Sequence, residues 1–120
     1  RALLTAINQR IRFMLNRDLT VGHAYFITIR DFSGLTRVLS QQVIPLLQEY
    51  FYEDWHRIQL VFRDLKEGNE KNNPQIIQHQ ELNELDILGY DHDEYDDEIE
   101  YLVTPESEIT PEMIRKVYLS

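Results

Sequence analysis

The most informative stretch of the chain is residues 35–51, LTRVLSQQVIPLLQEYF. Its apolar side chains recur three and four residues apart, which places them on one face of a helix: Leu35, Val38, Leu39, Val43, Leu46, Leu47, Tyr50 and Phe51. A stripe of this kind is typical of a helix that packs on a core. Pro45 interrupts the stripe, because proline has no N–H and its ring crowds the carbonyl of Gln41. We therefore expect a kink or a break, with Pro45 near the start of a second helix.

Helical spacing continues on both sides of this stretch. Upstream, one helical face carries Leu4, Ile7, Ile11, Met14 and Leu15. Downstream, Asp54 is suited to cap a helix whose apolar face holds Trp55, Ile58, Phe62 and Leu65. Asp31 or Ser33 is suited to cap the central stretch. Residues 1–65 are therefore predicted to form one antiparallel helical unit.

Residues 21–29, VGHAYFITI, interrupt the helical pattern. Their β-branched and aromatic side chains favour a strand on propensity alone. A buried turn followed by a short helix would have the same composition, so both interpretations stay open. Gly22 predicts a tight spot in the backbone at this point.

The pattern changes after residue 65. Residues 66–74 are rich in Gly, Asn and charge, which predicts an exposed loop. Residues 76–80 and 98–103 have the composition of two short strands, and a polar, acidic excursion separates them. Thr110 followed by Pro111 is the start pattern of a last helix.

The predicted fold class is mainly α, with a small helical bundle followed by an antiparallel β-hairpin. Three segments are expected: a helical unit over 1–65, a loop over 66–74, and a hairpin with an acidic loop and a short C-terminal helix over 75–120.

The formal net charge of −9 is unevenly distributed. Residues 1–65 contain eight Arg and six acidic residues, whereas residues 66–120 contain four basic and fifteen acidic residues. An acidic half should repel nucleic acid, so we expect no direct DNA binding from this chain. The absence of cysteine excludes disulfides and favours the cytoplasm. No apolar run approaches the roughly 20 residues that a membrane span needs.

Motifs of self-contained enzymes are absent from the sequence. There is no GxxxxGKS or GxxxxGKT phosphate loop, no GxGxxG, no GxSxG and no HExxH. A nucleotide hydrolase needs a phosphate cradle and an acid that holds a metal ion. We therefore predict that the chain has no catalytic residues and is not an enzyme on its own.

The acidic run of residues 91–98, DHDEYDDE, also fails as a metal site. Counted from Asp91, the fifth, sixth and twelfth positions of an EF-hand loop would be Tyr95, Asp96 and Leu102, which do not fit the oxygen ligand, Gly and Glu required there. None of the four histidines lies three or four residues from another, so no helix presents a His pair. A solvated acidic loop without a metal is the expectation.

His23 differs from the other histidines because it lies between two small residues, Gly22 and Ala24, directly before Tyr25 and Phe26. Small neighbours let a backbone or a ligand approach closely. Two interpretations follow: a structural His that is hydrogen-bonded in the core, or a functional His held at a surface.

Three stretches resemble a known family. Residues 7–11, INQRI, residues 21–26, VGHAYF, and residues 43–54, VIPLLQEYFYED, are similar to the end of the AAA+ module of McrB-type GTPases. In those proteins of modification-dependent restriction systems the pattern runs roughly LNxxI, IGHSYF and IxPLLxEYFxDD, in this order. Val21 and Ala24 stand here for Ile and Ser. The resemblance covers about residues 3–65, and the tail matches only in general plan.

The resemblance implies a small helical lid that packs over the nucleotide and against the neighbouring subunit of a hexameric ring. It implies that the phosphate loop belongs to a preceding part of the parent protein, which uses GTP or ATP with magnesium and has a nuclease subunit as a further partner. Gly22, His23, Tyr25 and Phe26 match the motif, which makes them candidates for the surface near the nucleotide or the subunit interface. Arg10 and Arg30 are candidate sensor-type arginines.

Two alternative functions follow from the composition. The first is a protein-interaction module in which residues 81–100, with ten acidic residues in twenty, dock a basic partner. The second is a stand-alone helical DNA-binding domain, which the net charge and the absence of a basic stripe oppose.

Overall fold

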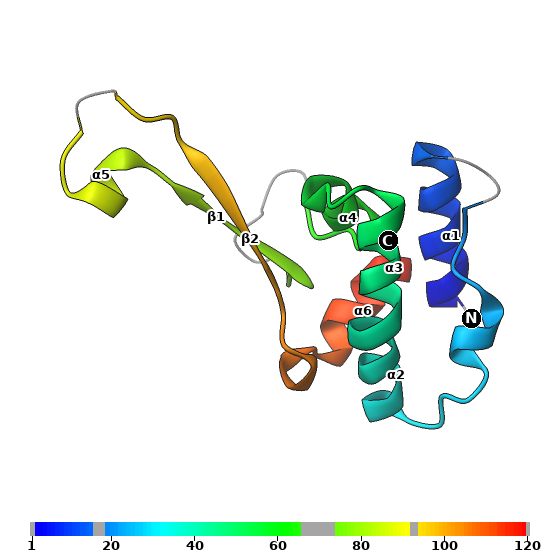
Figure 1. The fold of residues 1–120 in the computed structure, drawn as a ribbon. Coiled ribbons are helices and arrows are strands. Elements are labelled where there is room, and N and C mark those ends of the chain that lie inside the picture. The colour runs from blue at the N-terminus through cyan, green and yellow to red at the C-terminus, as the bar shows by residue number, and fades with distance from the viewer. Residues whose placement is uncertain (1, 16–18, 66–73, 92–93, 120) are drawn as a thin grey trace.

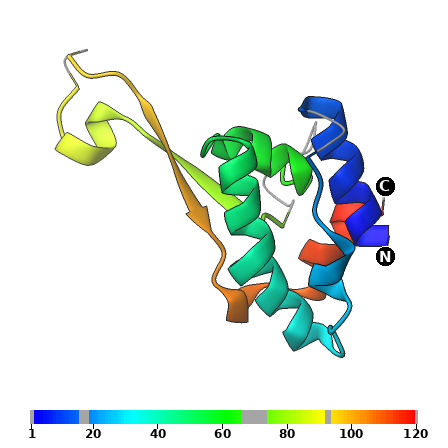
Figure 2. The ribbon, with the colours of Figure 1, turned by 45° about the vertical axis from the view of Figure 1, so that its right-hand side comes forward.

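Helices form the body of the molecule, and a two-stranded arm projects from it (Figures 1 and 2). The computed structural model describes residues 2–15, 19–65, 74–91 and 94–119. The molecule measures 53 Å along its longest axis and 29 and 27 Å across, because the arm extends away from the body. The body contains α1 (Ala2–Met14), α2 (Phe32–Val38), α3 (Ile44–Tyr50), α4 (Trp55–Val61) and α6 (Pro111–Tyr118). The predicted fold class, mainly α with an antiparallel hairpin and a C-terminal helix, is confirmed.

The stretch around Pro45 folds as one continuous rod with a wider turn in its middle (Figure 1). Between α2 and α3, residues Leu39–Val43 are π-helical, and the N–H of Ile44 donates to the carbonyl of Leu39, five residues back. Pro45 lies in the first turn of α3. A π-bulge is one of the ways in which a helix accommodates a residue that cannot donate a hydrogen bond. The predicted irregularity is confirmed, and it takes the form of a bulge rather than a break.

Side-chain caps start the helices where the sequence places them. Asp31 accepts a hydrogen bond from the N–H of Gly34 at 2.8 Å, and Asp54 accepts one from the N–H of Arg57 at 3.2 Å. Thr110 accepts one from the N–H of Met113 at 3.3 Å and is followed by Pro111 in the first turn of α6. Each cap satisfies a backbone donor that has no partner within the helix.

The core lies between α1, α3, α4 and α6. It contains apolar side chains that are fully or almost fully buried, including Ile7, Ile11, Leu39, Leu47, Ile58, Phe62, Ile76 and Val117. α1 packs on both α4 and α6, and α3 packs on α4. The C-terminal helix therefore lies in the same body as the first 65 residues. The predicted loop over 66–74 lies outside the described residues, apart from Pro74.

The strand expected at residues 21–29 is wrong. A 3-10 turn forms instead at His23–Phe26, closed by a hydrogen bond from the N–H of Tyr25 to the carbonyl of Gly22 at 3.3 Å. The aromatic composition that suggested a strand has a different cause, because Tyr25 and Phe26 turn inward and pack on the helical core. Propensity for a strand is largely a preference for a half-buried surface, and here a turn supplies that surface.

The arm consists of β1 (Ile77–Leu82) and β2 (Glu98–Val103), which pair antiparallel from Ile77 opposite Val103 to Leu82 opposite Glu98. Both predicted strands are confirmed. The predicted acidic excursion between them contains a short helix that was not expected, α5 (Glu84–Leu88). Asn83 caps it by accepting from the N–H of Asp86, and Gly89 ends it at a φ of 74°. His92 and Asp93, which belong to the predicted acidic loop, lie outside the described residues.

Within the described ranges, no helix is long and apolar enough to cross a membrane.

Candidate functional site

The 3-10 turn at residues 23–26 is held in place from both sides. The side chain of Asn8 on α1 forms two hydrogen bonds with the backbone of Val21: its Nδ2 donates to the carbonyl at 3.1 Å, and its Oδ1 accepts from the N–H at 2.6 Å. The hydroxyl of Tyr50 on α3 donates to the carbonyl of Thr20 at 2.9 Å. Burial, with smaller effects of Tyr25 and Glu49, raises the pKa of Tyr50, so this hydroxyl keeps its proton. The segment that enters the turn is therefore fixed to two helices.

The turn presents small residues and an imidazole to solvent. Gly22, His23 and Ala24 are exposed, whereas Tyr25 and Phe26 are half-buried against the core. Phe26 also lines an apolar hollow of about 430 Å³ between α1, α2 and α6. Of the two interpretations of His23, a structural His in the core is wrong, because His23 is exposed. We call the exposed residues Gly22–Ala24 together with this hollow the turn surface.

Gly22 does not mark a tight spot within the chain, contrary to the expectation from sequence. Its φ of −69° and ψ of 146° are open to any residue. A Cβ added at Gly22 would lie 3.8 Å from the ring of Tyr25, an ordinary van der Waals distance. The fold of this chain therefore does not require glycine at position 22.

Neither Arg10 nor Arg30 forms part of the contacts that hold the 3-10 turn. Asn8 and Arg10 are two residues apart on α1 and so point to different sides of the helix. The guanidinium of Arg10 donates to the carbonyl of Val61 at 2.7 Å and to that of Val117, at the C-terminal ends of α4 and α6. Burial, and then the charge of Arg63, lowers the pKa of Arg10. Arg30 is exposed shortly after the turn. A sensor role for either arginine stays a prediction.

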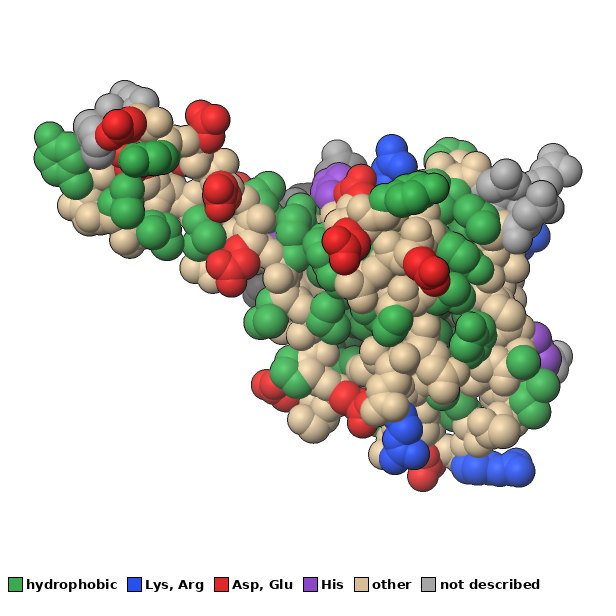
Figure 3. All heavy atoms as spheres, viewed as in Figure 1, with side chains coloured by type: hydrophobic (Ala, Val, Ile, Leu, Met, Phe, Trp, Pro, Cys, Tyr) green, Lys and Arg blue, Asp and Glu red, His purple; other side chains and the backbone are tan. Residues whose placement is uncertain are grey.

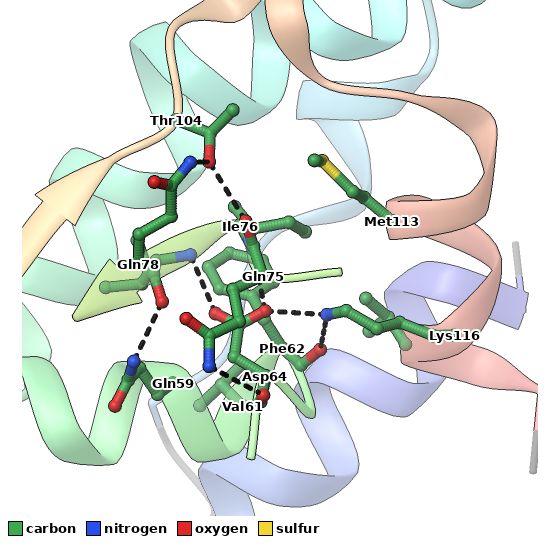
Figure 4. A network of polar contacts seen from close by, with 12 residues as sticks. Gln59, Val61, Phe62, Asp64, Gln75, Ile76, Gln78, Thr104, Met113 and Lys116 are labelled. Carbon is green, nitrogen blue, oxygen red and sulfur yellow. Dashed lines mark hydrogen bonds and ion pairs between the residues drawn. The ribbon is translucent and has the colours of Figure 1, made fainter. Parts of the chain in front are cut away.

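A second polar site lies where the arm joins the body (Figure 4). The fully buried carboxylate of Asp64 accepts hydrogen bonds from the N–H groups of Ile76 and Ile77, both at 2.7 Å, and from Nζ of Lys116 at 2.6 Å. Lys116 also donates to the carbonyl of Phe62 at 2.7 Å. One carboxylate thus connects the end of α4, the start of β1 and helix α6.

Further polar contacts surround this site. The buried amide of Gln59 donates to the carbonyl of Ile77 at 2.8 Å. Thr104, at the end of β2, donates through its hydroxyl to the carbonyl of Gln75 at 3.0 Å and accepts from Nε2 of Gln78 at 2.9 Å. We call Gln59, Asp64, Thr104 and Lys116 the arm-base network.

Burial dominates the electrostatics of the arm-base network. It raises the pKa of Asp64, although Lys116 and the two backbone N–H groups act in the opposite direction. It also lowers the pKa of Lys116, an effect that Asp64 opposes. Both shifts have the sign expected when removing two charges from water costs more than their attraction returns. The hydrogen bonds of Asp64 and Lys116 hold the start of β1 against α6, so the role of this ion pair is structural rather than catalytic.

Sequence reasoning missed the positioning role of Asn8 and the whole arm-base network. A signal existed for Asn8, because Asn is unfavourable inside a helix unless its side chain bonds elsewhere, and Asn8 adjoins the buried Ile7. Asp64 lies two residues after the apolar pair Val61-Phe62, and an acid so close to an apolar run suggests a buried partner. Nothing in the sequence identified Lys116 as that partner, since the two residues are 52 positions apart.

No group of three or more His, Cys, Asp or Glu side chains that could hold a metal ion occurs among the residues that the structure describes.

Comparison with known proteins identifies a family for the first half of the chain. Residues 1–59 match the family model described as McrB, alpha-helical lid domain. These residues are therefore a helical lid segment of the AAA+ kind, and specifically of the McrB type. The match, over 59 of the 120 residues, supports a place for this segment in a McrB-like restriction-system protein. No curated protein matches the chain, and no solved structure does. The arm lies outside the matched residues.

Proposed function

We propose that residues 1–59 act as the lid of a nucleotide-driven AAA+ motor, where the turn surface faces the nucleotide pocket or the neighbouring subunit of a ring. The motor would bind GTP or ATP with magnesium through a phosphate loop outside these residues, work in the cytoplasm and drive a nuclease partner in DNA restriction. This chain would contribute closure of the pocket and contacts between subunits, without any catalytic residue of its own.

The observation that carries the proposal is the construction of the turn. His23 is exposed, yet the backbone that leads to it is fixed by Asn8 and Tyr50. A side chain held on a rigid element loses little entropy when it meets a ligand or a partner. The exposed backbone at Gly22 adds to this argument, because the chain itself does not need glycine there. A close approach from outside the chain would use the space that a Cβ would fill.

The experiment is a substitution in the intact motor. His23→Ala is expected to lower nucleotide turnover or ring assembly clearly more than His56→Ala, an exposed histidine on α4 that serves as the matched control. In the 120-residue chain, His23→Ala should leave the melting temperature almost unchanged, because exposed substitutions usually change stability by no more than about 0.5 kcal/mol. Normal turnover and normal assembly of the His23→Ala motor would contradict the proposal.

The absence of catalysis is tested separately with the chain alone. Isothermal titration calorimetry with GTP and with ATP, each with magnesium, should detect no tight binding, because the sequence contains no phosphate loop. Sub-micromolar affinity, or turnover above the blank, would mean that the nucleotide site lies within these 120 residues.

A further inference from the structure

The arm packs on the body at its base, through Ile77, Tyr101 and Val103, and is uncovered beyond it. Of the strand residues, only Ile77 is buried, and on β2 Ile99 and Leu102 are 53% and 58% exposed. A two-stranded hairpin is marginally stable in water when nothing packs against it. Figures 1 and 2 show the arm extending away from the helices, so its far end does not rest on the body of its own copy.

The far end of the arm is apolar. Leu85, Ile87, Leu88, Tyr90 and Tyr95 are each more than half exposed, between 55% and 65%. Large apolar side chains gathered in this way mark an interaction site more often than a plain surface. Several of them line a hollow of about 310 Å³, together with the exposed Asp96 and Glu98 and the buried Glu84. We call residues 82–91 and 94–98 the arm tip.

The arm tip selects its partner by charge as well. Residues 81–100 contain ten acidic residues and no Lys or Arg. Green apolar and red acidic side chains lie next to one another over this part of the molecule in Figure 3. A surface that covers the tip must therefore offer both an apolar anchor and positive charge.

The body of the same chain offers such a surface between α1 and α4. Phe13 is 91% exposed, and together with Met14 and Leu60 it lines an apolar hollow of about 430 Å³ that also includes Arg10. Arg12 adjoins Phe13 and is exposed. Arg63 follows α4 and lies close enough to Arg10 for its charge to lower the pKa of Arg10. We call this surface the α1–α4 patch.

We propose that the arm tip of one copy docks on the α1–α4 patch of a second copy, with Phe13 entering the hollow of the tip and the exposed Arg12 facing the exposed carboxylates of Asp96 and Glu98. An aromatic anchor in a pocket, surrounded by complementary charge, is the usual centre of a specific interface. The contact joins two different surfaces, so a pair of copies still has one free tip and one free patch, and further copies can add head to tail into a ring or a filament. This contact involves no nucleotide and lies partly outside the lid segment, so it stands apart from the proposed lid function.

Sedimentation equilibrium of the 120-residue chain tests the contact. The weight-average mass is expected to rise above the 14.4 kDa of one copy at about 100 µM protein, as for a small, transient interface, and to fall back towards one copy in high salt. Leu88→Glu in the tip and Phe13→Asp in the patch are each expected to weaken association about tenfold or more, because each places a charge at an apolar anchor. Ile87→Glu serves as a second tip variant, and circular dichroism checks that all variants are folded.

Mixing the variants makes the test specific for a head-to-tail contact. An equimolar mixture of Leu88→Glu and Phe13→Asp retains one intact tip and one intact patch, so it should form dimers and stop there. Tyr52→Asp, at an aromatic residue on the body that is 93% exposed and lies away from the patch, should associate like the unaltered chain. A strictly monomeric unaltered chain, which would leave the tip to a basic partner of another kind, overturns the proposal. Association that survives both single variants, or a mixture that fails to pair, overturns it as well.

Discussion

Removing the charge of Asp64 should strongly lower the free energy of unfolding, although Asp64 belongs to neither proposed binding surface. Its carboxylate accepts three hydrogen bonds of 2.6–2.7 Å while fully buried. In Asp64→Asn the new amide nitrogen is a donor, and it faces a donor wherever it replaces an oxygen. At least one backbone N–H at the start of β1 then loses its acceptor, and Lys116 is left charged with only 13% of its side chain exposed.

The magnitude follows from these losses. Breaking a buried ion pair by removing one partner typically costs about 3–5 kcal/mol, which includes the uncompensated charge that remains. For a domain of this size such a loss corresponds to a fall in melting temperature of roughly 10–20 °C. Lys116→Met should cost less, about 2–4 kcal/mol, because Asp64 keeps its two backbone donors.

Urea denaturation of the two single variants and the double variant gives the interaction energy. The double variant Asp64→Asn/Lys116→Met is expected to lose about 1–3 kcal/mol less than the sum of the single losses, since the partners no longer leave each other unpaired. Arg57→Met is the control, because Arg57 forms an exposed pair with Asp54 at 3.4 Å and should lose less than about 1 kcal/mol. A loss below about 1 kcal/mol in Asp64→Asn, or additive single losses, would refute the reasoning.

Two further predictions concern single side chains. Asn8→Ala should lower the free energy of unfolding by about 1–3 kcal/mol, because the N–H and the carbonyl of Val21 both lose their partner. Thermal unfolding measures this loss, with Gln9→Ala at the exposed neighbouring position as the control. Equal melting temperatures of the two variants would contradict the prediction. Burial raises the pKa of Asp64 in the folded chain, so the folded chain binds this proton more tightly than the unfolded chain does. The pKa of an aspartate in the unfolded chain is about 3.9. Asp64 therefore adds stability as the pH falls from neutral towards that value. The stability difference between the unaltered chain and Asp64→Asn should therefore grow between pH 7 and pH 4 in urea titrations, and a difference that shrinks would show that the pKa of Asp64 is depressed instead.

Local rules predicted the parts of this fold that depend on neighbours in sequence. The caps of Asp31, Asp54 and Thr110 were predictable, because each accepts from an N–H three residues later. The disturbance at Pro45 was predictable as well, because a missing N–H acts within one helical turn. The two strands followed from composition and from the Gly- and Asn-rich segment that precedes them.

Contacts across long sequence separations were not predictable from pattern alone. Residues 21–29 have strand composition, yet the backbone of Val21 bonds to Asn8, and that of the preceding Thr20 bonds to Tyr50, instead of to a strand. The arm-base network joins Gln59, Asp64 and Lys116 across the whole second half of the chain. The surface position of His23 could be proposed from its small neighbours and the family motif, but not its fixation by two helices. Only the packing of the helices brings these groups together.

The polar groups at the base of the arm follow from the way the arm leaves the core. Ile76 and Ile77 are fully buried where β1 begins, and in the part of the chain that the structure describes the sheet has two strands, so on one side no further strand accepts their N–H groups. Unpaired N–H groups in a core are costly, and the two oxygens of the Asp64 carboxylate accept from one of them each. A carboxylate buried to that degree needs a cation in turn, and Lys116 supplies it from α6. Hydrogen bonds therefore link three features of the fold: the projecting arm, the buried Asp64 and the C-terminal helix α6. A change to any one of them leaves a buried polar group of the others without its partner.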